Sequence, residues 1–350
     1  MRKKISILIV FVLIVILTSG CLRVNREVYQ GGIYKSITKA DSWEQKVALL
    51  GLPGQMNFID NLEVNILVFD PQDSNTIYLG TKDNGLFVTY NTGDAWQKIT
   101  RLNQNKINAV AIDPRAKHIV YVATANQIFK TRDANRTWQG VYLDAVPGVE
   151  IMSLAISPFL SNLIFAGTSD GRFIMSEDGG ISWKNIQNFD GKIKEILINP
   201  NNSKIIYLNI ESKGIYYSEN QGEDWISLKE DCQGFSNPSN IDQIIFDPNF
   251  PDTLFSVCQG DIFKTQNQGK TWQQYQLLVS NNKLKINNLA INPQDSNFIY
   301  YLTNKALYKS VDGGENWITK PLPTRRIPAK IIIDPVNPDI VYLGVGGIIK

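Results

Sequence analysis

The sequence predicts an all-β ring, a seven-bladed β-propeller built from four-stranded antiparallel blades. All seven tryptophans end copies of one short pattern, and neighbouring copies lie 42 to 53 residues apart. A second pattern, an apolar run that ends in Asp, Asn or Ser followed by proline, also occurs seven times, at intervals of 42 to 48 residues. A period of 40 to 50 residues is typical of repeat architectures, and four short strands fit within each period.

A charged and then apolar segment opens the chain. Arg2, Lys3 and Lys4 precede an apolar run, 5–17, in which Ser6 is the one polar residue. At about 1.5 Å per residue this run spans roughly 20 Å, which is less than the ~30 Å hydrocarbon core of a membrane. The segment therefore indicates a cleaved signal peptide more than a permanent transmembrane helix.

Residues 17–21, L-T-S-G-C, resemble the lipobox of bacterial lipoproteins, in which the cysteine becomes the lipid-bearing first residue. Thr18 departs from the leucine that the lipobox prefers at that place. We expect residues 1–20 to be a lipoprotein-type signal peptide, Cys21 to carry the lipid that anchors the exported protein to the cell membrane, and 21–30 to be a tether. An ordinary secretory signal and an uncleaved anchor are the alternatives, and all three export the propeller, 31–350.

Charge and residue counts exclude several function classes. Loss of the signal lowers the basic residues from 35 to 32 against 33 acids, a net charge of −1, so nothing indicates nucleic-acid binding. The single histidine, His118, makes histidine-based metal or triad chemistry improbable and is expected on the surface. Cys232 and Cys258 either pair in an oxidising compartment or stay as two separate thiols.

The prolines mark the inner hairpin of each blade. Short strands such as 107–112 and 286–291 precede the Asx-Pro or Ser-Pro turn, and strands such as 76–80 and 340–344 follow it. Proline cannot donate to a β-ladder and Asx-Pro initiates a turn, so each pair forms a hairpin. The seven turns are Asp70-Pro71, Asp113-Pro114, Ser157-Pro158, Asn199-Pro200, Asp247-Pro248, Asn292-Pro293 and Asp334-Pro335.

A third strand then leads into the tryptophan pattern, and the tryptophan begins a fourth. The expected third strands are 85–89, 127–131, 172–176, 214–218, 261–265 and 306–310.

The tryptophan pattern resembles the Asp-box, or bacterial neuraminidase repeat, which reads Ser/Thr-x-Asp-x-Gly-x-x-Trp. Two copies match in full: Ser176, Asp178, Gly180, Trp183 and Ser310, Asp312, Gly314, Trp317. Three copies have Asn for Asp, at Asn91, Asn220 and Asn267; a fourth has Asn135 in the glycine place; and the most divergent has Thr38 and Ala40 before Trp43.

These residue types suit a structural turn. An Asp or Asn side chain accepts backbone N–H groups, Ser or Thr adds a second local bond, and Gly or Asn supplies a positive φ. The tryptophan is expected to anchor the box beside the next blade. Calcium would need several carboxylates on one loop, so we predict no metal and no cofactor.

The two ends complement one another. The first box, 36–43, has no inner hairpin before it, and the last inner hairpin, 330–344, has no box after it. We expect both to complete one shared blade, which removes two open sheet edges. The third strand of that blade could come from 31–35 or from 346–350, and the sequence leaves both open.

Three families share the box. Sialidases have six blades and an Arg-Ile-Pro motif before the first box, whereas Arg326-Ile327-Pro328 follows the last box here. Oligoxyloglucan-type glycosidases place paired carboxylates across a cleft between two propellers, and this chain has one. The chain is most similar to exported single-propeller proteins of the photosystem II assembly factor and sortilin ectodomain type, which implies protein binding without chemistry.

One group of loops carries an excess of positive charge. The links from the fourth strand of one blade to the first strand of the next hold nine basic residues and no acid in three segments, 97–106, 273–285 and 318–330; the other four links hold five basic residues and nine acids. We call the nine the basic sector and expect it to bind an acidic protein surface, an anionic glycan or a lipid headgroup, with solvated loop charges as the alternative. Its members are Lys98, Arg101, Lys106, Lys283, Lys285, Lys320, Arg325, Arg326 and Lys330.

The sequence thus predicts a non-catalytic, membrane-tethered extracytoplasmic propeller that binds a protein as an assembly factor or scaffold. The alternative is a carbohydrate-active enzyme or glycan-binding propeller, for which Asp144, Asp190, Glu230 and Asp231 are the first candidate acids.

Overall fold

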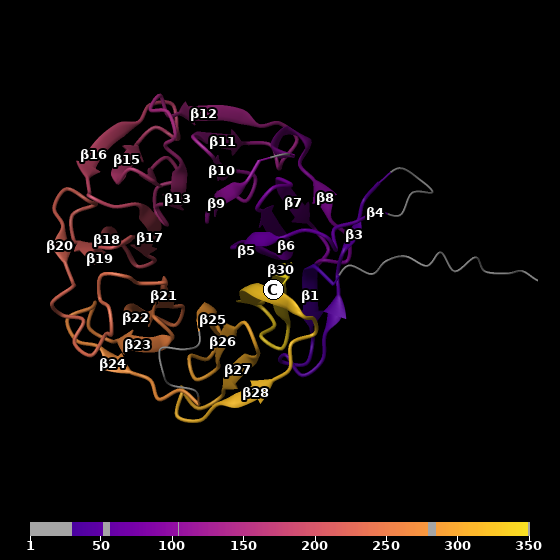
Figure 1. Cartoon of the computed structure of the whole chain (residues 1–350). Helices are drawn as coiled ribbons and strands as arrows, with labels where there is room; N and C mark the ends of the chain where they lie inside the picture. The colour runs from indigo at the N-terminus through magenta and orange to yellow at the C-terminus, as the bar shows by residue number, and fades with distance from the viewer. Residues whose placement is uncertain (1–29, 52–56, 104, 279–284, 349–350) are drawn as a thin grey trace, which may run out of the picture.

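The structure is a ring of seven four-stranded antiparallel sheets (Figure 1). It is a computed structural model that describes residues 30–51, 57–103, 105–278 and 285–348. The expected signal, lipidation site and most of the tether lie outside these ranges, as does Lys283. Within them, no helix reaches the length and hydropathy that a membrane span requires. The predicted fold class is confirmed.

Six blades are built from consecutive strands, numbered here as blades 1 to 6. Blade 1 contains β5 (Val64–Asp70), β6 (Asp73–Thr81), β7 (Leu86–Thr89) and β8 (Gln97–Lys98), and blade 2 contains β9 (Ile107–Ile112), β10 (Val120–Thr124), β11 (Gln127–Thr131) and β12 (Gln139–Leu143). Blade 3 contains β13 (Ile151–Ile156), β14 (Ile164–Thr168), β15 (Arg172–Ser176) and β16 (Lys184–Asn188), and blade 4 contains β17 (Ile193–Asn199), β18 (Asn202–Ile210), β19 (Gly214–Ser218) and β20 (Ile226–Ser227). Blade 5 contains β21 (Gln243–Asp247), β22 (Phe250–Cys258), β23 (Asp261–Thr265) and β24 (Gln273–Gln274), and blade 6 contains β25 (Ile286–Ile291), β26 (Ile299–Thr303), β27 (Leu307–Ser310) and β28 (Ile318–Lys320).

The seventh blade is shared between the two ends of the chain, as predicted. Its strand order is β2-β1-β30-β29, with β1 (Gly32–Ser36) and β2 (Glu44–Gln45) from the N-terminal side and β29 (Arg326–Ile333) and β30 (Val341–Ile348) from the C-terminal side. β1 is therefore the third strand, and Gly346 and Gly347 continue the second strand. This settles which of the two glycine-rich segments completes the blade.

A short additional hairpin lies between the shared blade and blade 1. β3 (Ala48–Leu49) pairs with β4 (Asn57–Phe58), and the backbone of Trp96 bridges to Leu49. The sequence patterns gave no signal for this hairpin.

Each inner hairpin turn is fixed by its Asp, Asn or Ser side chain. In all seven turns this side chain accepts the N–H of the residue after the proline, at 2.8–3.3 Å, and is buried. Proline lacks the intervening donor, so the side chain satisfies the first N–H that the turn offers.

The box turns are equally regular. In every box the N–H at the glycine place donates to the Ser or Thr Oγ that opens the box, at 2.8–3.2 Å. The residue at the glycine place and the one before it both have positive φ, including Lys39 and Ala40 in the most divergent copy. In that copy Thr38 Oγ1 accepts the Ser42 N–H, as Asp178 accepts the Ser182 N–H in a full box. A hydroxyl thus replaces the carboxylate.

The tryptophans pack against the preceding blade, so the expectation that they lie beside the next blade was wrong. Trp183 Nε1 donates to Val141 O of blade 2, and Trp317 Nε1 donates to Gln276 O in the segment that leaves blade 5. The box turn follows the third strand on the outer side of its blade. At that place it lies next to the fourth strand of the preceding blade. Trp225 and Trp272 donate to the glycine carbonyl of their own box instead. All seven tryptophan rings nevertheless pack in the apolar cluster between their own blade and the preceding one in the ring.

Tyrosines of five second strands provide a forward link, and Phe165 and Phe255 occupy the same position in blades 3 and 5. Tyr342 OH donates to Thr92 O at 2.8 Å, and Tyr121 OH donates to Gly179 O at 2.9 Å. Tyr207 and Tyr300 make the same bond to the box of the next blade, and Tyr78 accepts from Asn135. Each bond reaches a carbonyl or side chain that the positive-φ turn presents toward its neighbour.

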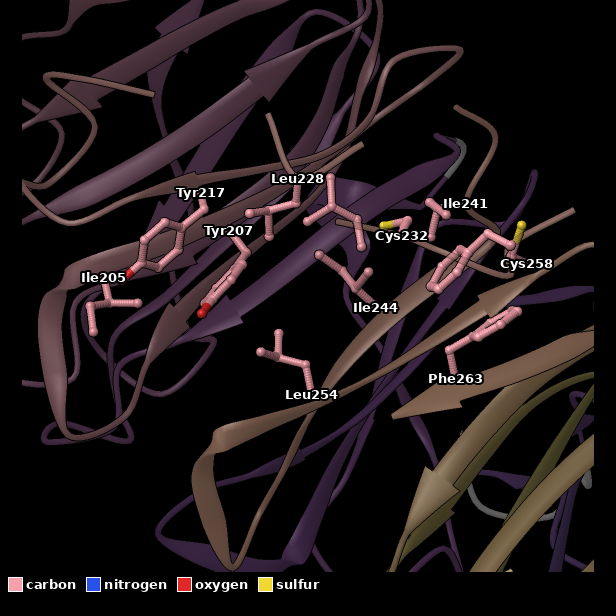
Figure 2. Packing of buried hydrophobic residues seen from close by; sticks show 12 residues of the cluster. Ile205, Tyr207, Tyr217, Leu228, Cys232, Ile241, Ile244, Leu254, Cys258 and Phe263 are labelled. Carbon is pink, nitrogen blue, oxygen red and sulfur yellow. The ribbon is translucent and has the colours of Figure 1, made fainter. Parts of the chain in front are cut away.

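Blade interfaces form the hydrophobic core. Figure 2 shows the cluster between blades 4 and 5, where Tyr207, Tyr217, Leu254 and Phe263 pack together. Cys232 and Cys258 lie in the same cluster as free, buried thiols rather than as a disulfide. Burial raises the pKa of Cys232 to about 12 and also raises the pKa of Cys258, so both stay protonated at neutral pH.

Replacing Tyr342 with phenylalanine should weaken ring closure. The substitution keeps the buried ring but removes the only donor that Tyr342 offers to Thr92 O, so we expect a loss of about 1–1.5 kcal/mol in the free energy of unfolding, measured in urea. Tyr301→Phe is the matched control, because Tyr301 is equally buried and, within the described ranges, its hydroxyl makes no hydrogen bond. Equal losses in both variants would contradict the role of this bond.

Candidate functional site

The seven inner strands surround a central channel, and their register aligns them in three layers of seven residues. The residues paired with the same position of each second strand form the first layer, the mouth ring: Ile66, Ala109, Ser153, Glu195, Gln243, Asn288 and Lys330. Two residues further along lies the aliphatic ring: Val68, Ala111, Ala155, Leu197, Ile245, Ala290 and Ile332. The third layer lies two residues beyond the aliphatic ring and consists of the buried Asp, Asn and Ser side chains of the Pro turns. Successive layers are about 6.5 Å apart along the strands.

The mouth ring lies at the link face, because each inner strand begins where a link ends. The register of β5, β9, β13, β17, β25 and β29 shifts by one residue beside the mouth ring, which is the signature of a β-bulge. A bulge turns an additional side chain toward the neighbouring strand. Polar residues can therefore contact both the lumen and the next blade.

A belt of hydrogen bonds joins neighbouring inner strands at this level. Asn65 Nδ2 donates to Ile107 O at 2.7 Å, Asn108 Nδ2 to Ile151 O at 2.9 Å, and Ser153 Oγ to Ile193 O at 3.0 Å. Gln243 both donates to Leu289 O and accepts the Leu289 N–H. Asn288 Oδ1 accepts the Ile331 N–H at 2.9 Å. The belt makes the channel wall rigid, since each bond crosses a blade boundary.

Glu195 and Lys330 are the two charged members of the mouth ring. Glu195 Oε2 accepts the Asn209 amide at 2.8 Å and the Ile244 N–H at 2.9 Å. Burial nevertheless raises the pKa of Glu195, and burial lowers the pKa of Lys330. The two charges attract one another across the lumen, but they make no ion pair within 4.0 Å.

Two overlapping cavities occupy the channel. The first, about 410 Å³, lies in the mouth half and is lined by Lys106, Asn108, Lys194, Glu195 and Lys330 among others. The second, about 640 Å³, extends to the Pro turns and is lined mainly by Ile, Leu, Val, Phe and Pro side chains. They share Ile66, Val68, Leu197 and Lys330, and most of the charged side chains of the channel lie at its mouth end.

The structure places the members of the basic sector in several different surroundings. Arg101, Lys285 and Arg325 are exposed on the links, and Lys98 and Arg101 lie over the rings of Phe87 and Phe129. Lys106 and Lys330 line the channel mouth instead. Arg326 is half-buried where β29 begins.

Lys320 does not lie free on the link face as expected. Its Nζ is 2.8 Å from Asp41 in the box of the shared blade, because β28 runs alongside that box. The sector is also interrupted by the link 44–63, which carries Glu44 and Glu63 between its members. The three exposed cations are therefore the part of the sector best placed to meet a partner.

The acids proposed for a catalytic pair lie in separate structural contacts. The Asp144 side chain is fully buried and accepts bonds from Arg172 Nη2 at 2.6 Å, Tyr142 OH at 3.0 Å and the Val146 N–H at 2.9 Å. Asp190 is exposed and pairs with Lys213 at 2.8 Å. Glu230 and Asp231 lie on the link from blade 4 to blade 5. In the described part of the chain, no three His, Cys, Asp or Glu side chains form a group that could hold a metal ion.

The mouth ring is the feature that the sequence analysis missed. A signal was present, because each of its residues stands four positions before the Asp, Asn or Ser of a Pro turn. At this position several of the seven otherwise apolar inner strands carry a polar or charged residue, among them Glu195, Gln243, Asn288 and Lys330. Lys330 was expected on a link as a member of the basic sector, whereas it belongs to the mouth ring.

Comparison with known families identifies the chain. The model of the photosynthesis system II assembly factor YCF48 family matches residues 55–333. The chain belongs to this family.

Among individual proteins, the chain is similar to an oligoxyloglucan-reducing end-specific xyloglucanase of Emericella nidulans, at 24% identity over 185 residues, 45% of this chain and 23% of that protein. It spans about a quarter or less of the curated xyloglucanases it matches. The solved GH74 xyloglucanase of Xanthomonas campestris matches with a TM-score of 0.67 at 16% identity, over 81% of this chain and 51% of that one. A structure of YCF48 bound to D1 peptide matches with a TM-score of 0.63 at 17% identity, over 81% of this chain and 92% of that one. At these identities the structural likenesses establish the shared fold.

Removing the Asp144 carboxylate should destabilise the protein. Asp144→Ala leaves the half-buried Arg172 without its shortest ion pair, and we expect the free energy of unfolding to fall by about 2–3 kcal/mol. Asp190→Ala is the control and should change it by less than about 0.5 kcal/mol, because that pair is exposed. Urea unfolding at neutral pH measures both, and a small effect at Asp144 would contradict the structural role.

Proposed function

We propose that this protein is a membrane-tethered, extracytoplasmic propeller that binds a protein partner and acts as an assembly factor or scaffold rather than as an enzyme. The observation that carries the proposal is the family match across 55–333. The YCF48 structure that matches along nearly its whole length holds a D1 peptide, which supports a protein as the class of partner.

The link face is the surface that suits such a partner. Arg101, Lys285 and Arg325 are exposed there, and none of the three makes an ion pair within the described ranges. The belt of hydrogen bonds holds the inner strands rigid, so the links that carry these cations extend from a rigid scaffold. An acidic protein surface would complement them.

The second candidate is a carbohydrate-active enzyme or glycan-binding propeller. It is favoured by the likeness to xyloglucanases in sequence and in fold. An enzyme of that kind needs two carboxylates about 5–9.5 Å apart in one pocket. Asp144, the most buried of the candidates, already accepts bonds from Arg172, Tyr142 and Val146. Hydrolysis of xyloglucan by the purified chain would replace the binding proposal with this one.

Reversing the three exposed charges should weaken partner binding. The triple variant Arg101→Glu, Lys285→Glu, Arg325→Glu is expressed with an affinity tag in the cells that normally make the protein, crosslinked, and its neighbours are quantified by mass spectrometry. We expect recovery of the main crosslinked partner to fall about tenfold, since each rim charge contributes about 0.5 kcal/mol.

The matched control carries the same change in net charge elsewhere. Lys204, Lys229 and Lys270 are exposed outside the sector, and their triple replacement by glutamate should leave partner recovery unchanged. Equal recovery with both triple variants would contradict a role for the sector.

The anchor has its own test. If Cys21 carries the lipid, Cys21→Ala should move the protein from the membrane fraction to the soluble exported fraction, and labelling with a radioactive fatty acid should be lost. Replacing Thr18 with leucine, the residue that the lipobox prefers, should preserve both. Retention of Cys21→Ala in the membrane would favour an uncleaved anchor.

A further inference from the structure

The channel combines opposite charges with an apolar interior. Glu195 belongs to blade 4 and Lys330 to the shared seventh blade, so the two side chains enter the mouth ring from opposite sides of a seven-membered circle. Directly below them lies the aliphatic ring, in which Val68, Leu197, Ile245 and Ile332 are all partly exposed to the lumen.

Neither charge is neutralised by an ion pair. Glu195 has two hydrogen bonds on Oε2, and Lys330 has no hydrogen bond within the described residues. Burial raises the pKa of the acid and lowers the pKa of the base, so both ionised forms lack the solvation they would have in water. A ligand with an ammonium group beside Glu195 and a carboxylate beside Lys330 would compensate both residues for the solvation that they lose on burial.

The other charges near the mouth already have partners. Lys194 Nζ donates to Ile241 O, and Lys106 Nζ lies 3.4 Å from Glu150. They leave Glu195 and Lys330 as the opposed pair that faces the lumen. The mouth as a whole has three lysines and two glutamates, a small positive excess that favours entry of a carboxylate.

We propose that the channel binds a small zwitterion of the α-amino acid class with an apolar side chain. Its ammonium group would lie at Glu195, its carboxylate at Lys330, and its side chain within the aliphatic ring. The two cavities, about 410 and 640 Å³, fall within the range of ligand sites that have mostly apolar walls and a few placed polar groups. This site is separate from the exposed cations proposed to meet a protein.

Three probes of similar length separate the contributions of the two charges. L-norleucine carries both charges, hexanoate lacks the ammonium group, and hexylamine lacks the carboxylate. Isothermal titration of the full-length chain in detergent should show norleucine binding at least about tenfold more tightly than either of the others. Hexanoate binding as tightly as norleucine would overturn the part assigned to Glu195, and hexylamine doing so would overturn the part assigned to Lys330.

Two variants test the residues directly. Lys330→Met and Glu195→Gln keep side-chain length and should each weaken norleucine binding about tenfold or more. Lys229→Met, on an exposed link, is the control and should bind as the unmodified chain does. Circular dichroism and thermal melting establish that each variant is folded. If Glu195→Gln fails to fold, the comparison of probes on the unmodified chain still decides, and no binding of norleucine at millimolar concentration overturns the proposal.

Discussion

The structure depends on hydrogen bonds that cross from one blade to the next. A blade of four strands satisfies its own ladder, but its two faces and its inner edge need neighbours. Tyrosine hydroxyls reach forward to the box turns, tryptophans pack backward, and the belt at the mouth ring joins the inner strands. Because these contacts form a closed circle, the shared blade is required for every other blade to have both neighbours.

The box turns explain why the repeats tolerate so much sequence change. In the copies with aspartate, hydrogen bonds from the turn lower the pKa of Asp133, Asp178 and Asp312 to about 2. What the turn requires is an oxygen acceptor two residues after the Ser or Thr, and asparagine or the Thr38 hydroxyl supplies one. Any stabilisation from ionisation is confined to the aspartate copies, and it would be lost as the pH falls from about 4 toward 2.

The sequence predicted the ring because its two signals are local and repeated seven times. The Pro turn and the box each specify a strand boundary through a side chain that bonds its own backbone, so strands such as Ile107–Ile112 and Ile286–Ile291 could be placed to the residue. The site was harder, because Glu195 and Lys330 lie 135 residues apart and meet only when the circle closes. Lys320 shows the same limit, since its partner Asp41 lies at the other end of the chain. The direction in which each tryptophan packs is set by neighbouring blades and has no local signature.

The N-terminal segment enters the ring on the link face. The Gly31 N–H donates to Asp60 O, and Thr324 Oγ1 donates to Gln30 O, so residue 30 is held between two links, next to the start of the third strand of the shared blade. It stands nine positions after Cys21, which corresponds to a fully extended reach of about 30 Å. With a lipid at Cys21, as proposed, the link face could never be farther than that from the bilayer at its nearest edge. The partner and any small ligand would then be met in the thin layer next to the membrane surface, and the face with the Pro turns would be directed away from it.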